Sequence, residues 1–238
     1  MAKLGLWLRG LFRFTAGPKT PNSFNWDDQG VVPSPGNQAP LAACICYASC
    51  LAAATRYRIK TGNVISVAPR VMHLCTMQLP PGSGTNSSRF EKAALAYGLP
   101  FLLEAPMAAQ AAAMSSDAQC IAFRASPRLK VTALRRFSAS DEVKFALSST
   151  GPVVVFMDLY DDFSKHYVAG TVYAPPAGAT PTTSHAVCLI GYDDTKQCWI
   201  GVNSQGPGWG AEGRFRLKYG ACDVMGPGAA AYAVEIQA

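Results

Sequence analysis

Charged residues make up only 15% of this 238-residue chain, which contains just three histidines. No apolar stretch approaches the roughly 20 residues needed to cross a bilayer, so we expect no membrane span. The 21 Lys and Arg residues are scattered, without a basic run, zinc-finger spacing or interleaved aromatic pattern. The formal net charge of +6 therefore fits a solvated surface, and we expect no nucleic-acid partner. The apolar content of 49% is typical of a globular chain, long enough for two lobes or one large domain.

The first 14 residues lack the features of a cleavable secretory signal. Arg9 and Arg13 interrupt the apolar run, and no small-residue cleavage site follows. We therefore expect a protein that is intracellular or exported by a route without a cleavable signal. Four apolar residues share a helical spacing: Leu4, Trp7, Leu8 and Leu11. A short helix packed on the protein body is the favoured interpretation, and weak membrane-surface contact through residues 1–14 is the alternative.

A thiol, an imidazole and a side-chain amide follow one another along the chain, at Cys44, His185 and Asn203. These are the parts of a cysteine nucleophile, the base that activates it and the group that orients the base. His185 precedes the apolar run Ala186–Ile190, and Asn203 follows the apolar run Trp199–Val202. Their order and residue types together predict nucleophilic cysteine chemistry.

Several segments in the same order resemble the papain family of cysteine peptidases. They are Asn25-Trp26-Asp27, Gln38 to Cys44, Gly151-Pro152-Val153-Val154-Val155, Tyr167 to Tyr173, His185-Ala186-Val187 and Asn203 to Gly210. The resemblance covers nearly the whole chain after about residue 23. It implies an α+β, papain-like two-lobe fold. A helical N-terminal lobe and an antiparallel, β-barrel-like C-terminal lobe would flank the active cleft.

The same resemblance divides the chain into an N-terminal extension, 1–22, and a catalytic domain, 23–238. The helical lobe would span about 23–120 and the β-rich lobe about 121–238. Periodicity predicts a helix from 44 to about 60 that Gly62 ends, and shorter helices over Glu91–Tyr97 and Asp141–Leu147. The predicted strands are Val153–Leu159, Thr171–Tyr173, Ala186–Tyr192, Trp199–Val202, Arg214–Lys218 and Tyr232–Ile236.

Two cysteines, Cys44 and Cys46, compete for the role of nucleophile. The family's glutamine precedes its nucleophile by six residues, and Gln38 lies six residues before Cys44. Cys44 would begin the helix, where the helix dipole and unpaired N–H groups favour a thiolate. Cys46 would point away from the active cleft, because residues two apart on a helix do not share a face. The two other histidines are interpreted as core or surface residues. They are His73 and His166.

The resemblance also implies substrate contacts. Gln38 would donate its side-chain N–H, together with the backbone N–H of Cys44, to the oxyanion. Phe156, Ser184 and Ala186, with Thr183, would surround the pocket for the residue two before the scissile bond. None of these four is charged, so we expect apolar residues to be preferred there.

Three positions depart from the family's pattern. Ile45 replaces the tryptophan after the nucleophile, and the double glycine near Cys75 is not evident. Gln205 stands where the family has a tryptophan that shields the Asn–His hydrogen bond. We therefore expect the bond between Asn203 and His185 to be more open to water.

The remaining cysteines predict little chemistry. By the resemblance, Cys75 and Cys120 are candidates for a disulfide. Cys46 and Cys50, four residues apart, could hold a metal, but their apolar neighbours favour a place in the core, and we assign no metal and no cofactor. The resemblance implies a monomeric peptidase that cleaves polypeptides through a Cys-His-Asn thioester mechanism. A deamidase or transglutaminase acting on a protein partner, and a catalytically weak binding module, are the alternatives.

Overall fold

The structure is a computed structural model that describes residues 20–102, 105–227 and 230–238. The N-terminal residues 1–14, with their predicted helix and membrane-surface contact, lie outside the described residues. No helix in the part of the chain that is described is long and apolar enough to cross a membrane.

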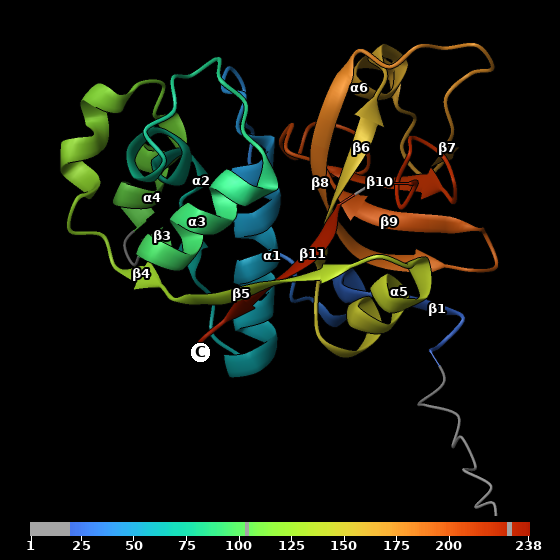
Figure 1. Cartoon of the computed structure of the whole chain (residues 1–238), viewed down its shortest axis with the longest axis horizontal. Coiled ribbons are helices and arrows are strands. Elements are labelled where there is room, and N and C mark those ends of the chain that lie inside the picture. Colours follow the sequence, from blue (N-terminus) through green and yellow to red (C-terminus); the bar gives the residue numbers. More distant parts are fainter. Residues whose placement is uncertain (1–19, 103–104, 228–229) are drawn as a thin grey trace, which may run out of the picture.

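Helix α1 (Cys44–Thr61) runs through the middle of the molecule, between the shorter helices and the large sheet (Figure 1). It ends as predicted at Gly62, whose φ of 75° favours glycine and whose N–H bonds the carbonyl of Arg58. The other α-helices are α2 (Pro69–Val71), α3 (Ser87–Tyr97), α4 (Ala105–Ala113), α5 (Ser140–Ser149) and α6 (Asp161–His166). A π-helical turn, η2 (Met72–Thr76), extends α2, and two 3-10 helices are η1 (Trp26–Gln29) and η3 (Asp117–Phe123).

The large sheet has eight strands in the order β5-β11-β6-β8-β9-β10-β7, with β1 paired to β8. Their bounds are β1 (Ser23–Asn25), β5 (Val131–Phe137), β6 (Val153–Leu159), β7 (Val172–Tyr173), β8 (Thr183–Asp193), β9 (Cys198–Val202), β10 (Arg214–Lys218) and β11 (Ala231–Ile236). Every pair is antiparallel except β10 with β7. Among the described strands β5 and β7 stay unpaired with each other, so the sheet is open and not the closed barrel that "barrel-like" suggests.

Strand β8 is buried on both faces, which explains its continuous apolar run. Ala186, Cys188 and Ile190 pack in the cluster that contains α1. Val187 and Leu189 pack instead with residues of α5 and β9. The alternation places the middle of the sheet between two cores and holds α1 firmly against β8.

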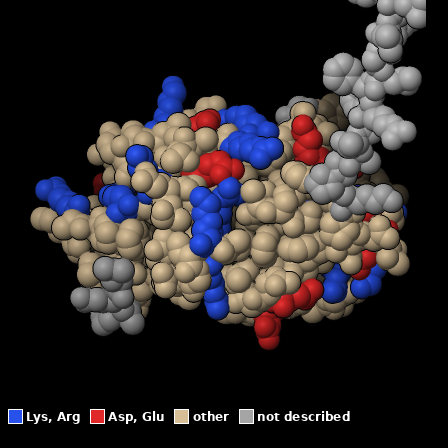
Figure 2. Space-filling model, turned by 90° about the horizontal axis from the view of Figure 1, so that it is seen from below, with Lys and Arg blue, Asp and Glu red and all other residues tan. Residues whose placement is uncertain are grey.

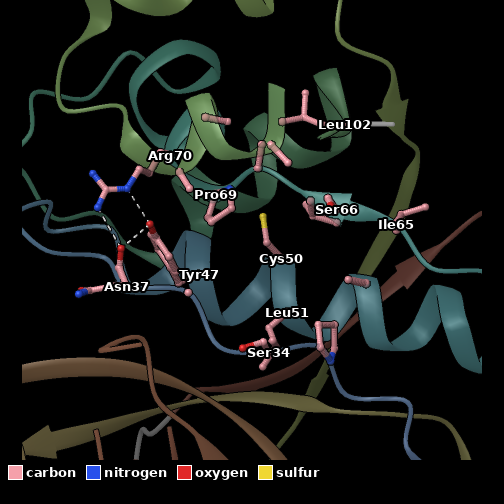
Figure 3. A pocket seen from close by; sticks show the side chains of 18 of the residues that line it. Ser34, Asn37, Tyr47, Cys50, Leu51, Ile65, Ser66, Pro69, Arg70 and Leu102 are labelled. Carbon is pink, nitrogen blue, oxygen red and sulfur yellow. Dashed lines mark hydrogen bonds between the residues drawn. The ribbon is translucent and has the colours of Figure 1, made fainter. Parts of the chain in front are cut away.

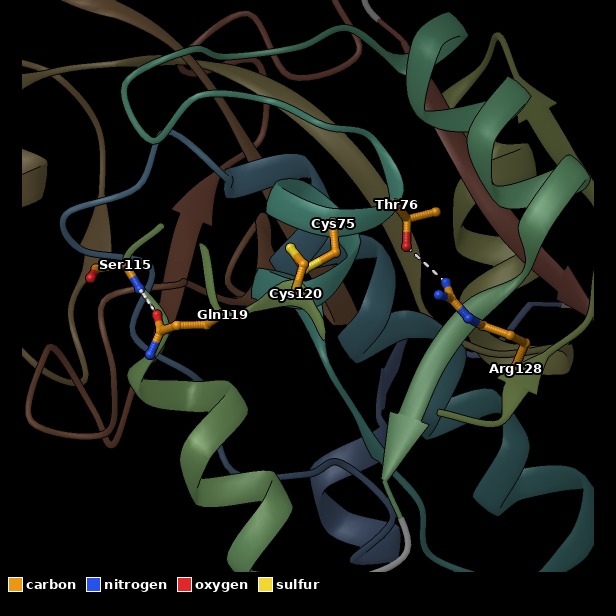
Figure 4. Close-up of a disulfide and its surroundings, with 6 residues drawn as sticks. All are labelled: Cys75, Thr76, Ser115, Gln119, Cys120 and Arg128. Carbon is orange, nitrogen blue, oxygen red and sulfur yellow. Dashed lines mark hydrogen bonds between the residues drawn. A yellow bond between two sulfur atoms is a disulfide. The ribbon is translucent and has the colours of Figure 1, made fainter. Parts of the chain in front are cut away.

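A smaller sheet lies on the other side of α1, with β2 (Ser66–Val67), β3 (Leu99–Leu102) and β4 (Arg128–Leu129) in sequence order. The disulfide that the resemblance suggested, Cys75–Cys120, is present and joins η2 to η3 (Figure 4). Nearby, Arg128 Nη1 donates to Thr76 Oγ1 at 2.7 Å, which ties β4 to the same turn. The predicted lobe boundary near residue 120 stays a prediction.

Charges are dispersed over the face seen in Figure 2. Lys and Arg side chains lie at several separate places, among uncharged residues and Asp and Glu side chains. Among the described residues several charged groups are paired, for example Arg136 with Glu91 and Arg214 with Asp27.

Candidate active site

Cys44 is the first residue of α1, and its side chain is half-buried. The preceding residue, Ala43, provides no side-chain cap. The N–H groups of the first turn are therefore not occupied by a capping oxygen, and the helix dipole favours an anion there. The backbone N–H groups of Ile45 and Ala186 favour the anionic form of the Cys44 sulfur and so lower the pKa of its thiol.

The pKa values of Cys44 and His185 move in opposite directions. Burial by itself raises the pKa of the Cys44 thiol, but the hydrogen bond and charge of His185, with the two backbone N–H groups, outweigh burial and lower it. Burial likewise lowers the pKa of His185, but its hydrogen bond to Cys44 and the thiolate charge, with Asn203, raise it above the ordinary value. Each group stabilises the charged form of the other, which favours a thiolate–imidazolium pair.

His185 and Asn203 come from neighbouring antiparallel strands. His185 lies in β8, and Asn203 directly follows β9. The His185 Nε2 is 2.9 Å from Asn203 Oδ1, which leaves Nδ1 to face Cys44. His185 and Asn203 are only 6% and 3% exposed. The bond is therefore largely shielded from water in this chain, although Gln205 stands where the family has a tryptophan.

The side chain of Gln38 is held at both its oxygen and its nitrogen. Its Oε1 accepts from Ser204 Oγ at 2.5 Å, and its Nε2 donates to the Leu41 carbonyl at 3.1 Å. Its backbone N–H also donates to the Ser204 carbonyl at 2.8 Å. One N–H of the amide is thus occupied, and the other has no partner among the described residues.

Ser204 is a site residue that the sequence reasoning missed. It is 5% exposed and connects the Asn203 loop to Gln38 through both its side chain and its backbone. Its own N–H donates to Asn203 Oδ1 at 2.8 Å. The only sequence feature that could have indicated this role is its position directly after Asn203. That position does not show that the hydroxyl points toward Gln38.

The competing thiols and imidazoles lie elsewhere. Cys46 is fully buried, its thiol contacts Met77 Sδ at 3.8 Å, and burial raises its pKa well above the ordinary value. Burial also raises the pKa of Cys50. His73 is buried, with its Nε2 3.2 Å from the Pro80 carbonyl, and His166 ends α6. Only the Cys44 sulfur meets an imidazole within the described residues.

Two of the residues predicted to form the substrate pocket share one hollow, and the other two do not. Phe156 and Ser184 line a hollow of ≈ 310 Å³, whereas Ala186, the register partner of Phe156, is 1% exposed and does not line it. Thr183 does not line it either. Two carboxylates that the sequence reasoning did not include, Asp158 and Asp223, do. The wall of this hollow is therefore not uncharged.

The loop after Gln78, which the sequence did not place, lies beside the nucleophile. The Pro81 carbonyl accepts from the N–H of Ala42 at 2.9 Å, two residues before Cys44. Gly82 and Gly84 follow in this loop, and both have open space where a Cβ would be.

Comparison with known proteins points to one family. The family model described as papain family cysteine protease matches residues 20–232. The chain is similar to ananain from Ananas comosus, at 27% identity over 218 residues that cover 86% of this chain and 59% of ananain. It is also similar to cathepsin S from Bos taurus, at 24% identity over 89% of this chain and 64% of that protein. The chain thus spans less than two thirds of the length of these relatives.

Solved structures share the fold. A cysteine protease of Carica candamarcensis in complex with E-64 has a TM-score of 0.73 and 22% identity, over 91% of this chain and 100% of that one. The bromelain protease of Ananas comosus, in complex with the E64 inhibitor, has a TM-score of 0.72 and 24% identity over the same shares.

Proposed function

Because this chain belongs to the papain family of cysteine proteases, we propose that it hydrolyses peptide bonds through a thioester formed on Cys44. The observation that carries this proposal is the buried 2.9 Å hydrogen bond between His185 and Asn203 beside Cys44, with the pKa of the thiol lowered although burial alone would raise it. A thiolate at the start of a helix, paired with an imidazolium, is the reactive form of a cysteine nucleophile.

In the first half of the reaction the Cys44 thiolate attacks the peptide carbonyl carbon. The developing oxyanion accepts from the Cys44 backbone N–H and the second N–H of Gln38 Nε2. As the carbon–nitrogen bond breaks, the His185 imidazolium gives its proton to the leaving amine. The products are a free amine and a thioester between Cys44 and the acyl part of the substrate.

In the second half water replaces the amine. The now neutral His185 accepts a proton from the water as its oxygen attacks the thioester carbonyl. The carbon–sulfur bond breaks, which releases the carboxylic acid and restores the thiolate–imidazolium pair. Asn203 keeps the ring oriented in both halves through its bond to Nε2. The steps balance with water as co-reactant, and none calls for a metal or cofactor.

Incubation with an unfolded protein, followed by mass analysis, tests the proposal. We expect peptide fragments from the native chain and none from a Cys44→Ala variant purified in the same way. Release of ammonia without fragments would indicate amide hydrolysis of side chains and would reject the peptidase proposal. Intact substrate with no ammonia released would reject both.

A further inference from the structure

Arg70 is a buried cation with no acidic partner among the residues that the structure describes. It lies in α2, is 6% exposed, and forms no salt bridge within the described residues. Burying a charged group is costly unless its hydrogen-bonding groups are satisfied. Its guanidinium instead donates to four neutral oxygens: those of Tyr47 Oη and the carbonyls of Asn37, Ala39 and Met114.

Two of these carbonyls lie on either side of Gln38. Arg70 Nη2 donates to the Asn37 carbonyl at 2.9 Å and to the Ala39 carbonyl at 2.5 Å. One nitrogen thus holds the short segment 36–39, here called the strap, at both peptide groups that flank the proposed oxyanion donor. Figure 3 shows the guanidinium meeting Asn37 and Tyr47 at one end of a pocket of ≈ 520 Å³.

Tyr47 connects this arrangement to the helix that carries the nucleophile. It lies three residues after Cys44, and its backbone N–H bonds the Ala43 carbonyl at 3.1 Å. Its hydroxyl donates to the Asn37 carbonyl at 2.8 Å and accepts from Arg70 Nε at 2.9 Å. The strap is also close to the tyrosine ring at Gly36, where a Cβ would lie 2.6 Å from Cε1. These contacts fix the position of the strap relative to the first turn of α1.

The opposite edge of the strap is bound to the loop that carries Asn203. The N–H of Gln38 donates to the Ser204 carbonyl, and the Gln38 side-chain Oε1 accepts from the Ser204 hydroxyl. The N–H of Gly206 donates to the Gly36 carbonyl at 3.1 Å. Without Arg70 and Tyr47, the strap would be held only by this loop and by the bonds between Gln38 and Leu41. Its distance from Cys44 would then be less firmly set by α1.

We propose that Arg70, acting with the Tyr47 hydroxyl, is a positioning residue that holds Gln38 at the correct place relative to Cys44. This inference rests on the proposed function, because it concerns the oxyanion donor of that reaction. Arg70 touches no reacting atom. It acts because an oxyanion donor must be held within a fraction of an ångström, and small displacements of a catalytic group cost large factors in rate.

A double-mutant cycle on kcat tests the coupling. The substrate is a peptidyl aminomethylcoumarin with leucine two residues before the scissile bond. We expect Gln38→Ala to lower kcat on the order of 100-fold, as loss of one oxyanion donor does. Arg70→Gln and Tyr47→Phe should each lower kcat about 10-fold, with a smaller change in KM. In the Gln38→Ala background the same two changes should lower kcat no further.

Two controls separate positioning from a general loss of structure. Alkylation of Cys44 by iodoacetamide forms no oxyanion, so its rate should be unchanged in Arg70→Gln and Tyr47→Phe. Arg56, which is 5% exposed and pairs with Glu235, is a matched buried arginine remote from the strap. Arg56→Gln should lower thermal stability without lowering kcat. Equal kcat losses with and without Gln38, or a parallel fall in alkylation, would overturn the inference.

Hydrogen exchange gives a readout that does not depend on activity. The N–H of Gln38 should exchange faster in Arg70→Gln and Tyr47→Phe than in the native chain or in Arg56→Gln. Unchanged exchange in the strap would overturn the inference even if the enzyme is active. Absence of native turnover, with faster exchange in the two variants, would reject the proposed function while leaving the structural role of Arg70 intact.

Discussion

His185 Nε2 and Asn203 Oδ1 lie 2.9 Å apart across two neighbouring strands, with both residues nearly inaccessible to water. The separation in sequence is 18 residues, and the pairing of β8 with β9 closes it. The pairing of these two strands therefore sets the orientation of the imidazole ring. The same ring then faces the start of α1, which packs against the sheet through its own buried residues.

Replacement of Cys44 should abolish activity, whereas replacement of Cys46 should not. We expect Cys44→Ser to reduce turnover on the order of 10⁴-fold or more and to prevent labelling by an epoxide thiol inactivator. Cys46 is fully buried against Met77 and its raised pKa keeps it a thiol, so Cys46→Ser should retain turnover and labelling. Loss of labelling in Cys46→Ser alone would show that the assignment is reversed.

The pH dependence should be bell-shaped. The pKa of Cys44 is lowered and that of His185 is raised, and both shifts favour the thiolate–imidazolium pair. Activity should rise with pH as the thiol loses its proton, and fall at higher pH as the imidazolium loses its own. Measurement of kcat/KM across the pH range checks this. A single rise near pH 8.5, the range of an ordinary thiol, would show that the pair does not form.

Asn203 should orient the imidazole and take no part in proton transfer. We expect Asn203→Ala to lower kcat by about 10- to 100-fold, because the ring then samples unproductive rotamers. His185→Ala, which removes the base, should lower it by on the order of 10⁴-fold. Both variants are compared by kcat on one peptide substrate. Equal losses would contradict this division of roles.

Substrate preference should reflect the hollow beside Phe156. We expect a small or medium apolar residue at the position two before the scissile bond, and arginine to be accepted better than glutamate there. The reason is that Asp158 and Asp223 line the hollow, so a substrate carboxylate would be repelled. Phe156→Ala should admit aromatic residues, with gains of about 10- to 200-fold in kcat/KM.

A peptide library with one varied position measures these preferences. Asp158→Asn should reduce the ratio of arginine to glutamate acceptance. Asp161→Asn is the matched control, because Asp161 is exposed and pairs with Lys165 outside the hollow. A ratio unchanged in Asp158→Asn, or changed equally in both variants, would show that this hollow is not the specificity pocket.

Elements with a clear local signal could be predicted from the sequence. Helix α1 ends at the predicted glycine, and β6 and β10 have the predicted bounds. Strand β5 was missed because its burial does not alternate. Val131 and Leu134 pack into the cluster that contains α1, while Phe137 packs into the other, so both faces contribute buried residues and the period of two is lost.

The sequence by itself determined the identity of the chemical groups: a thiol at the first residue of a helix, an imidazole beside an apolar strand and an amide after the next one. These groups and their places can be identified from residue type and spacing, because the ends of helices and strands depend largely on the preferences of nearby residues. The tertiary structure alone decided the surroundings of those groups. Burial of the His185–Asn203 bond despite Gln205, the bond of Ser204 to Gln38, the bonds of Arg70 to the Asn37 and Ala39 carbonyls, and the carboxylates near Phe156 join residues from separate elements. Their directions depend on how the strap, α1 and the sheet pack, and no local pattern carries that information.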